Sequence, residues 1–350
     1  MKYLRRTTLR QVAAAADAVA DQVDAEPARF LAMTSYFNRA SLSFPMRLPS
    51  RRRLLSSAVV AGMSLAVAGC TSQKEFPEYT AYTLNAEGQK GELRGSYRRL
   101  AEEIHRLRQE TAGDDISLSV YNYSDQTTFV FTPDFRGYEA STVKVPIALT
   151  AMRRAFAEGT VLSEELREAV KASISFSDNN ATSTIFASLA DADDDAKSAE
   201  INKTYDLLNI TQTRADSGWG ANLTGSEDHL KIQRAVYEGV SWVAMDDMQI
   251  LREAMRATDP ASQGWGVGVL AKLVGAGADT TDVDTAQQVL CKNGWLPDDL
   301  AKWYINSDGF ALYADKTFAF SVMLNGFEER AEGQHVASRV IEATIKNLAL

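Results

Sequence analysis

Ser141 and Lys144 are a pair of residues whose types and spacing could carry out a reaction. Proline is tolerated only in the first turn of a helix, so Pro146 requires the helix through Ala148–Phe156 to begin close to Ser141. Unpaired N–H groups at a helix N-terminus favour negative charge on a nucleophile. Lys144 follows one turn later on the same face, and a partly desolvated lysine can take a proton from a serine hydroxyl. Taken alone, Ser141–Lys144 also fits an ordinary serine on a helix surface and a solvated lysine.

Two further polar segments follow along the chain. Ser177–Asn179, with the sequence Ser-Asp-Asn, opens an apolar helix, and taken alone it could simply cap that helix. Lys292–Gly294, with the sequence Lys-Asn-Gly, follows the apolar residues Val289–Cys291, which are typical of a strand. Neither segment is specific by itself.

In this order, the three segments resemble the S-x-x-K, S-D-N and K-T-G signatures of the penicillin-recognising serine acyltransferases, the family of class A β-lactamases and penicillin-binding proteins. The ordered triple is far more specific than any single match. The resemblance covers roughly residues 92–350. It implies an acyl-serine intermediate, a β-lactam or a peptidoglycan peptide as the small-molecule partner, and neither a cofactor nor a metal.

The resemblance also implies a role for each residue. Ser141 would be the nucleophile, Lys144 its base, and Ser177 the group that relays a proton to the leaving nitrogen. Asn179 would hold the substrate amide. Lys292 would place its charge near Ser177 and the substrate carboxylate.

The residues after Lys292 would complete the substrate site. Gly294 would allow close backbone approach, and the N–H of Trp295 would form an oxyanion hole with the N–H of Ser141. Asn293 also belongs to the substrate-binding set, but it replaces the Thr or Ser of the family and removes a hydroxyl that helps to hold the substrate carboxylate. Substrate recognition is therefore expected to differ.

Lys316–Thr317 is a competing match to K-T-G, but Phe318 stands at the glycine position. Two strands must follow this element before the closing helix, and only Lys292 leaves room for them.

Two other departures from the family affect the cleft. Ser177 follows Ser141 by only 36 residues, which implies loss of the segment that walls one side of a class A cleft. The E-x-x-L-N motif that carries the water-activating Glu is also missing, and Arg214–Gly220 occupies its place with Asp216, a typical turn residue, as the nearby carboxylate. We expect an exported serine hydrolase whose deacylation is slow, with a cell-wall D,D-peptidase or a non-catalytic wall-binding lipoprotein as alternatives.

Hydrophobic periodicity predicts an α+β fold with three α/β/α layers. Its five-stranded antiparallel sheet would be covered on one face by both terminal helices, and a mostly helical subdomain would run from Ser141 to about Thr258. The predicted strands are Ile116–Tyr123, Thr127–Thr132, Gln288–Leu296, Trp303–Tyr313 and Thr317–Leu324, and the terminal helices are 97–112 and His335–Leu348.

The N-terminal region is typical of an exported lipoprotein. Residues 46–70 form a signal peptide in which a basic start precedes the uncharged stretch Leu54–Gly69 and a lipobox ends at Cys70. Lipidation of Cys70 would anchor the protein to the outer face of the bacterial cytoplasmic membrane. Residues 1–45 are an upstream extension or a long n-region, residues 71–91 a polar tether, and residues 92–350 the hydrolase domain.

Charge argues against nucleic acid as a partner. The chain holds 37 Lys and Arg and 46 Asp and Glu. Residues 1–70 contain 10 of the basic residues but only 4 of the acidic ones. The remaining 27 basic and 42 acidic residues give the rest of the chain a net charge near −15, which repels phosphate backbones.

Overall fold

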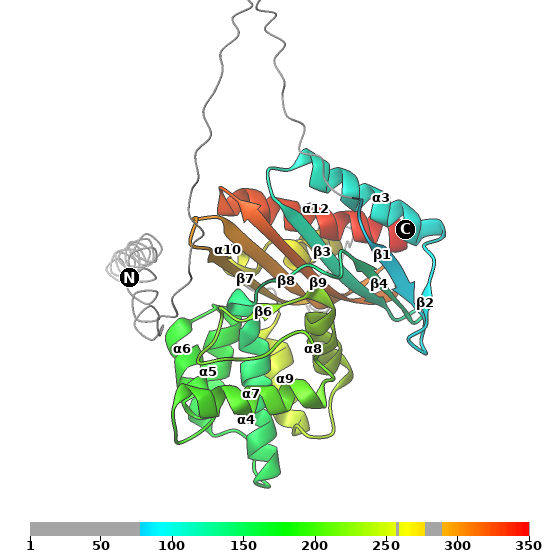
Figure 1. Cartoon of the computed structure of the whole chain (residues 1–350). Coiled ribbons are helices and arrows are strands. Elements are labelled where there is room, and N and C mark those ends of the chain that lie inside the picture. The colour runs from blue at the N-terminus through cyan, green and yellow to red at the C-terminus, as the bar shows by residue number, and fades with distance from the viewer. Residues whose placement is uncertain (1–77, 257–258, 277–288, 350) are drawn as a thin grey trace, which may run out of the picture. The chain divides into compact units, whose positions relative to one another are not determined.

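Residues 78–256, 259–276 and 289–349 are described by a computed structural model of the chain (Figure 1). Their main sheet has seven strands in the order β2-β1-β4-β3-β9-β8-β7, and each neighbouring pair is antiparallel. A second, two-stranded sheet pairs β5 with β6. The strands are β1 (Ala81–Leu84), β2 (Lys90–Gly91), β3 (Asp115–Asn122), β4 (Thr127–Phe131), β5 (Gly137–Tyr138), β6 (Leu223–Thr224), β7 (Val289–Pro297), β8 (Trp303–Tyr313) and β9 (Lys316–Phe327).

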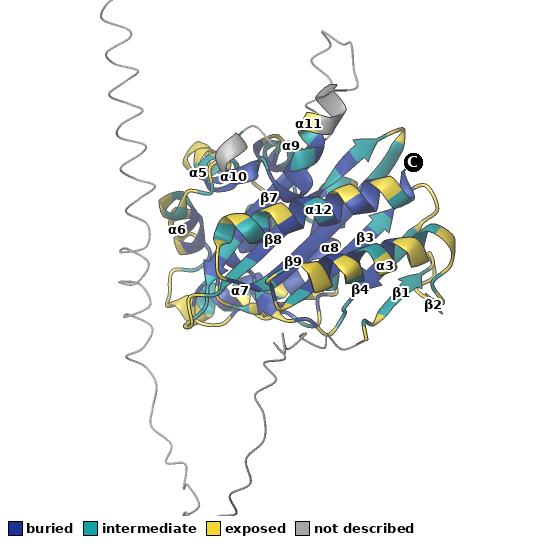
Figure 2. Ribbon diagram, turned by 90° about the horizontal axis from the view of Figure 1, so that it is seen from above, coloured by how far each residue is buried: buried dark blue, intermediate teal, exposed yellow. Residues whose placement is uncertain are grey.

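Two helices from opposite ends of the domain cover one face of the sheet, α3 (Gly95–Glu110) and α12 (Arg330–Leu348) (Figure 2). Apolar side chains recur along α3 at Leu100, Ile104 and Leu107, and all three are buried in the core between the helices and the strands. Spacings of three and four residues place them on a single side of the helix, which is why α3 packs in this orientation.

The other face of the sheet carries the helical subdomain, with α8 packed against β3, β8 and β9 (Figure 1). At its centre α4 is buried from Lys144 to Met152, so this helix forms the axis of a second hydrophobic core. The helices of the subdomain are α4 (Lys144–Ala157), α5 (Glu164–Ser175), α6 (Asn179–Ala187), α7 (Asp194–Leu207), α8 (Ser226–Glu238) and α9 (Met245–Ala254). The short helical segments are η1 (Ala140–Val143), α10 (Pro260–Gln263), η2 (Gly266–Gly268) and α11 (Val269–Ala276).

The predicted three-layer α+β fold is confirmed, but the prediction of five strands is wrong. Strands β1 and β2 extend the sheet to seven, and they lie within residues 71–91, which the sequence predicts to be a tether before a domain starting at residue 92. The ring of Tyr79 stacks on Phe131 with centroids 5.3 Å apart, and the Tyr82 hydroxyl donates to Glu227. Strand β1 has only four residues, all half-buried, so its sequence is too short to show the alternation of apolar and polar residues that identifies a strand.

Several predictions concern residues 1–77, outside the described part of the chain. They are the extension 1–45, the signal peptide 46–70 with its lipidated Cys70, and the first part of the tether. Among the described residues, no helix combines the length and the apolar character needed to cross a membrane.

Candidate active site

Ser141 lies in the short turn η1 that leads directly into α4. Ala140, the residue before it, has a φ of 49°, a left-handed conformation that costs free energy for any residue with a Cβ. Its N–H donates to the Gly220 carbonyl at 2.8 Å, which helps to hold this conformation. Pro146 lies in the first turn of α4, where its missing N–H leaves no hydrogen bond unmade. The turn presents Ser141 as a partly exposed residue at the start of a buried helix.

Strand β7 approaches this turn at Gly294. A Cβ added to Gly294 would lie 2.8 Å from the Ser141 nitrogen and 2.9 Å from the Thr142 nitrogen, distances that real Cβ atoms do not show. Only glycine therefore lets the edge strand come this close to the backbone of the turn that contains Ser141.

The N–H of Trp295 points away from the neighbouring strand β8. The Cys291 N–H donates to the Met255 carbonyl at 2.7 Å, and the Asn293 N–H donates to Gln263 Oε1 at 3.0 Å, so both point out of the sheet edge. Alternate residues of a strand share this direction, which puts the Trp295 N–H on the same side. The segments that carry the Ser141 and Trp295 N–H groups thus meet at Gly294, an arrangement suited to an oxyanion hole.

The Ser177 hydroxyl accepts hydrogen bonds from two buried lysines. Lys144 Nζ donates to Ser177 Oγ at 3.0 Å, to the Ser177 carbonyl at 2.5 Å and to Asn179 Oδ1 at 2.8 Å. Lys292 Nζ donates to the same Oγ at 3.0 Å and to the Asn293 carbonyl at 2.8 Å. A hydroxyl with both lone pairs engaged directs its own proton elsewhere, so Ser177 is set to act as a proton donor.

Local structure fixes Ser177 in place. Asp178 is the N-cap of α6, and its carboxylate accepts the N–H of Ala181 at 2.8 Å. Ser177 itself has a φ of 59°, a strained conformation of the kind that clusters at functional sites.

Burial changes the acid–base behaviour of Lys292. The side chain is fully buried, and desolvation, only partly opposed by Cys291 and Asp308, lowers the pKa of Lys292 to about 7. A lysine with this pKa changes its charge near neutral pH, as proton-transfer chemistry at such a pH requires.

No protein-family model matches the sequence, and no curated protein matches it. Solved structures do match. The TLA-1 extended-spectrum β-lactamase superposes with a TM-score of 0.59 at 15% identity, over 73% of this chain and 100% of that one. A β-lactamase from Sphaerobacter thermophilus DSM 20745 gives 0.56 at 15% identity, over 73% and 98%. A class A β-lactamase from Bacteroides cellulosilyticus DSM 14838 gives 0.55 at 12% identity, over 73% and 99%.

The fold is that of the class A β-lactamases. Identities this low show the fold alone, so the activity has to be argued from the residues of the site.

Within this β-lactamase fold, the two lysines that could match the K-T-G signature make different contacts. Lys292 is on the edge strand β7 and contacts Ser177. Lys316 begins the inner strand β9, and its Nζ donates to the carbonyls of Leu348 and Ala349 at the end of α12.

The side chain of Asn293 is fully buried and hydrogen-bonded within the protein. Its Nδ2 donates to the carbonyls of Ser262 and Trp265, and its Oδ1 accepts from Ser307 Oγ at 2.7 Å. These bonds tie β7 to the segment containing α10 and η2. A direct role for the Asn293 amide in binding substrate stays a prediction.

The loop 214–220 contacts the site through an aromatic ring. Lys144 Nζ lies 5.7 Å from the centroid of the Trp219 ring, within the range of a cation–π interaction. Asp216 is exposed, and its carboxylate accepts from Ser217 Oγ at 3.1 Å.

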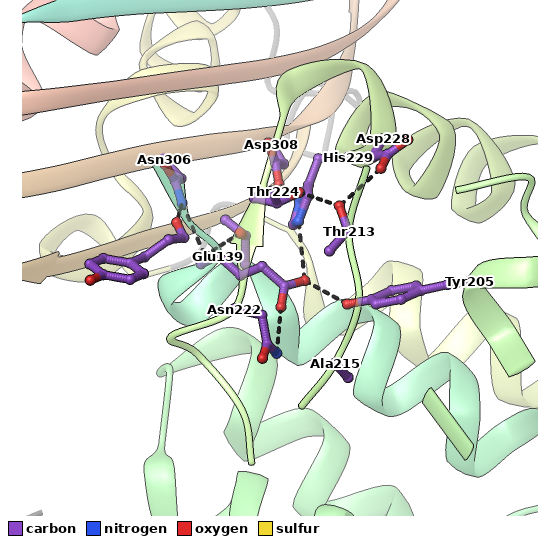
Figure 3. Close-up of polar contacts among 12 residues, drawn as sticks. Glu139, Tyr205, Thr213, Ala215, Asn222, Thr224, Asp228, His229, Asn306 and Asp308 are labelled. Atoms are coloured by element: carbon purple, nitrogen blue, oxygen red, sulfur yellow. Dashed lines mark hydrogen bonds and ion pairs between the residues drawn. The ribbon is translucent and has the colours of Figure 1, made fainter. Parts of the chain in front are cut away.

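Sequence reasoning missed a second cluster of charged residues, which includes Glu139, two positions before Ser141 in the chain (Figure 3). Its members are the buried residues Glu139, Tyr205, His229 and Asp308, together with Asn222. Glu139 and His229 are 90 positions apart in the chain, and His229 and Asp308 are 79 apart, so no local motif could have connected them.

Proposed function

We propose that this protein is an exported serine hydrolase that attacks β-lactam or D-alanyl-peptide carbonyls through an acyl-Ser141 intermediate. One observation carries the proposal: two buried lysines from distant segments donate to the hydroxyl of Ser177, beside a helix N-terminus that presents Ser141. Burying two lysine side chains is costly whether or not they stay charged, and nothing about packing alone requires both at a single hydroxyl. The residues match the roles that the family resemblance implies.

The proposed acylation moves one proton around a closed route. Lys144 donates three hydrogen bonds in this arrangement, so it must first lose one proton to solvent. The neutral amine then takes the proton of the Ser141 hydroxyl while Oγ bonds to the carbonyl carbon, and the oxyanion forms against the N–H groups of Ser141 and Trp295. Ser177 then gives its proton to the leaving nitrogen as the carbon–nitrogen bond breaks. The Lys144 ammonium, hydrogen-bonded to Ser177 Oγ, restores that proton. The protonated form of Lys292 would attract the substrate carboxylate, and that carboxylate would in turn favour the protonated form.

We further propose that the acyl-enzyme is hydrolysed slowly. Hydrolysis needs a second base to activate water. The loop that stands in place of the E-x-x-L-N motif brings the Trp219 ring close to Lys144, while its carboxylate Asp216 is exposed. Both features support an enzyme that acylates readily and turns over poorly.

The location is proposed from the sequence alone. Lipidated Cys70 would hold the domain on the outer face of the bacterial cytoplasmic membrane, where peptidoglycan precursors and β-lactams are present. The intact mass of the mature protein should show diacylglycerol on Cys70, and Cys70→Ser should abolish it. An unmodified Cys70 in the wild-type mature protein would contradict the anchor.

The decisive experiment is labelling of the purified protein with a fluorescent penicillin. We expect stoichiometric labelling of the wild type, mapped to Ser141 by mass spectrometry, and none for Ser141→Ala. Ser188→Ala is the matched control, because Ser188 is exposed at the C-terminal end of α6 and should leave labelling unchanged. Label on another serine would overturn the assignment. Absence of label on the folded wild type would favour a non-catalytic wall-binding protein, and release of D-alanine from a D-alanyl-D-alanine peptide would favour a D,D-peptidase.

A further inference from the structure

Behind the nucleophile turn, three fully buried side chains of alternating charge lie in a row (Figure 3). His229 on α8 has its Nδ1 2.6 Å from Asp308 Oδ2 on β8 and its Nε2 3.4 Å from Glu139 Oε1. The Tyr205 hydroxyl donates to Glu139 Oε1 at 2.5 Å, and Asn222 Nδ2 donates to Glu139 Oε2 at 3.0 Å. One imidazolium therefore pairs with two carboxylates.

One end of this row belongs to the nucleophile turn itself. Glu139 precedes Ser141 by two residues, and its carboxylate and backbone are both held in place. The Glu139 N–H donates to the Asn222 carbonyl at 3.0 Å, and the Glu139 carbonyl accepts from Asn306 Nδ2 at 3.0 Å. Glu139 therefore links the row directly to Ala140, the residue of positive φ that precedes Ser141.

The other end of the row reaches the sheet beside Lys292. Asp308 is the direct partner of Lys292 across the β7–β8 pair, and Asn306 is the partner of Gly294. The same two strands thus carry the anchor of the row and the glycine that touches the Ser141 backbone.

The buried row is stable only while His229 is protonated, because its charge pairs with the two carboxylates. An unpaired buried carboxylate costs several kcal/mol, as an order of magnitude, and an ion pair with good hydrogen bonds offsets much of that cost. Burial alone would lower the pKa of His229, but Asp308 and Glu139 outweigh it and raise the pKa to about 10. The imidazolium is therefore present throughout the neutral range and pairs with both carboxylates. The one net negative charge that remains is stabilised by the hydrogen bonds that Tyr205 and Asn222 donate to Glu139.

We propose that Glu139, His229 and Asp308 are positioning residues for acylation: their buried ion pairs hold the Ser141 turn against strand β7 and thereby fix the geometry of the oxyanion hole. This inference rests on the proposed function. Because none of the three touches the substrate in this arrangement, it requires that their loss lowers the rate constant of acylation and leaves the affinity for the penicillin before acylation nearly unchanged.

The test compares variants of the purified full-length protein by stopped-flow acylation with a fluorescent penicillin. We expect His229→Gln to lower the acylation rate constant on the order of 10²-fold, the cost of a displacement of about 1 Å. Tyr205→Phe removes only one hydrogen bond and keeps the shape of the side chain, so a loss of roughly fivefold is expected. In both variants the pre-acylation dissociation constant should change by less than about twofold.

Asp228→Asn is the matched control. Asp228 is a buried neighbour of His229 on α8, but its carboxylate accepts from the Gln212 N–H and the Thr213 hydroxyl and has no hydrogen bond to Glu139, His229 or Asp308 among the described contacts. This variant should lose stability without losing acylation rate. An equal rate loss in Asp228→Asn and His229→Gln would reduce the row to general structural support and overturn the proposal.

A second readout does not depend on activity. Hydrogen exchange should quicken at the amides of Ala140 and Thr142 in Tyr205→Phe and His229→Gln but not in Asp228→Asn, since these amides bond within the turn and to loop 214–222. Unchanged exchange there in Tyr205→Phe, which should fold, would overturn the proposal even if His229→Gln fails to fold. If the wild type takes no penicillin, the proposed function fails, whereas exchange still decides whether the row holds the turn.

Discussion

Two of the fully buried basic side chains near the Ser141 turn, His229 and Lys292, have pKa values that their surroundings shift in opposite directions. His229 lies between the carboxylates of Asp308 and Glu139, which raise its pKa from 6.5 to about 10. Lys292 donates to a hydroxyl and a backbone carbonyl, and burial lowers its pKa from 10.5 to about 7. The contrast teaches that the partners of a buried cation decide whether it is a fixed charge or one that changes in the working pH range.

The largest expected effect comes from removing the proposed base, Lys144, and it should exceed the effect of removing His229. Lys144→Ala should lower the acylation rate constant about 10³-fold, because the general base is lost. His229→Gln should lower the same rate constant only about 10²-fold. Stopped-flow fluorescence with the same penicillin measures both. A smaller loss in Lys144→Ala than in His229→Gln would remove Lys144 from the role of base.

Gly294→Ala tests the contact through which both regions act on Ser141. The added methyl would fall 2.8 Å from the Ser141 nitrogen, so the turn and β7 must separate and the oxyanion donors must diverge. We expect acylation to fall on the order of 10²-fold with little loss of penicillin affinity. Gly159→Ala, in a φ of 71° with open space around it, is a control for the general cost of altering a glycine. It should lower the melting temperature without affecting the rate.

His229 and Lys292 should change the free energy of unfolding in opposite directions as the pH rises. The raised pKa of His229 gives stability that is fully present below pH 6.5 and is lost as the pH rises to about 10. Lys292 binds fewer protons folded than unfolded between about pH 7 and 10.5, so its contribution rises with pH over that window.

The wild-type free energy of unfolding should therefore change little between pH 7 and 10 on account of these two groups. Relative to it, His229→Gln should slope upward with pH and Lys292→Met downward, each by at most about 1.4 kcal/mol per pH unit. Denaturant titrations across that range measure the slopes. Parallel curves for the wild type and both variants would show that neither pKa is displaced.

The sequence predicted the parts of the molecule that leave a local pattern. The hairpin β3–β4 and the strand Trp303–Tyr313 follow from β-branched and aromatic runs, and α12 from its apolar period. Lys144, Ser177 and Lys292 belong to short motifs that follow one another in a fixed order, and the structure brings their side chains into hydrogen-bond contact. Their catalytic roles stay predictions.

The sequence could not predict the features that depend on distant contacts. Strand β1 is recognisable only through its pairing with β4, and His229 is one of three scattered histidines until α8 sets it against Asp308. Burial, which gives His229 and Lys292 their opposite pKa shifts, is a property of the folded chain and has no signature in either residue.

The smallest expected effect concerns Asp216 and the release of the acyl group. The wild type should give a burst of about one equivalent of hydrolysed nitrocefin, followed by slow turnover, because acylation is faster than deacylation. Asp216 is exposed and its carboxylate bonds to Ser217, so Asp216→Asn should change neither phase by more than about twofold. A variant that keeps the burst but loses the slow phase would identify Asp216 as the base that activates water. Turnover without a burst in the wild type would instead mean that deacylation is fast, and the proton route through Lys144 would then have to serve both steps.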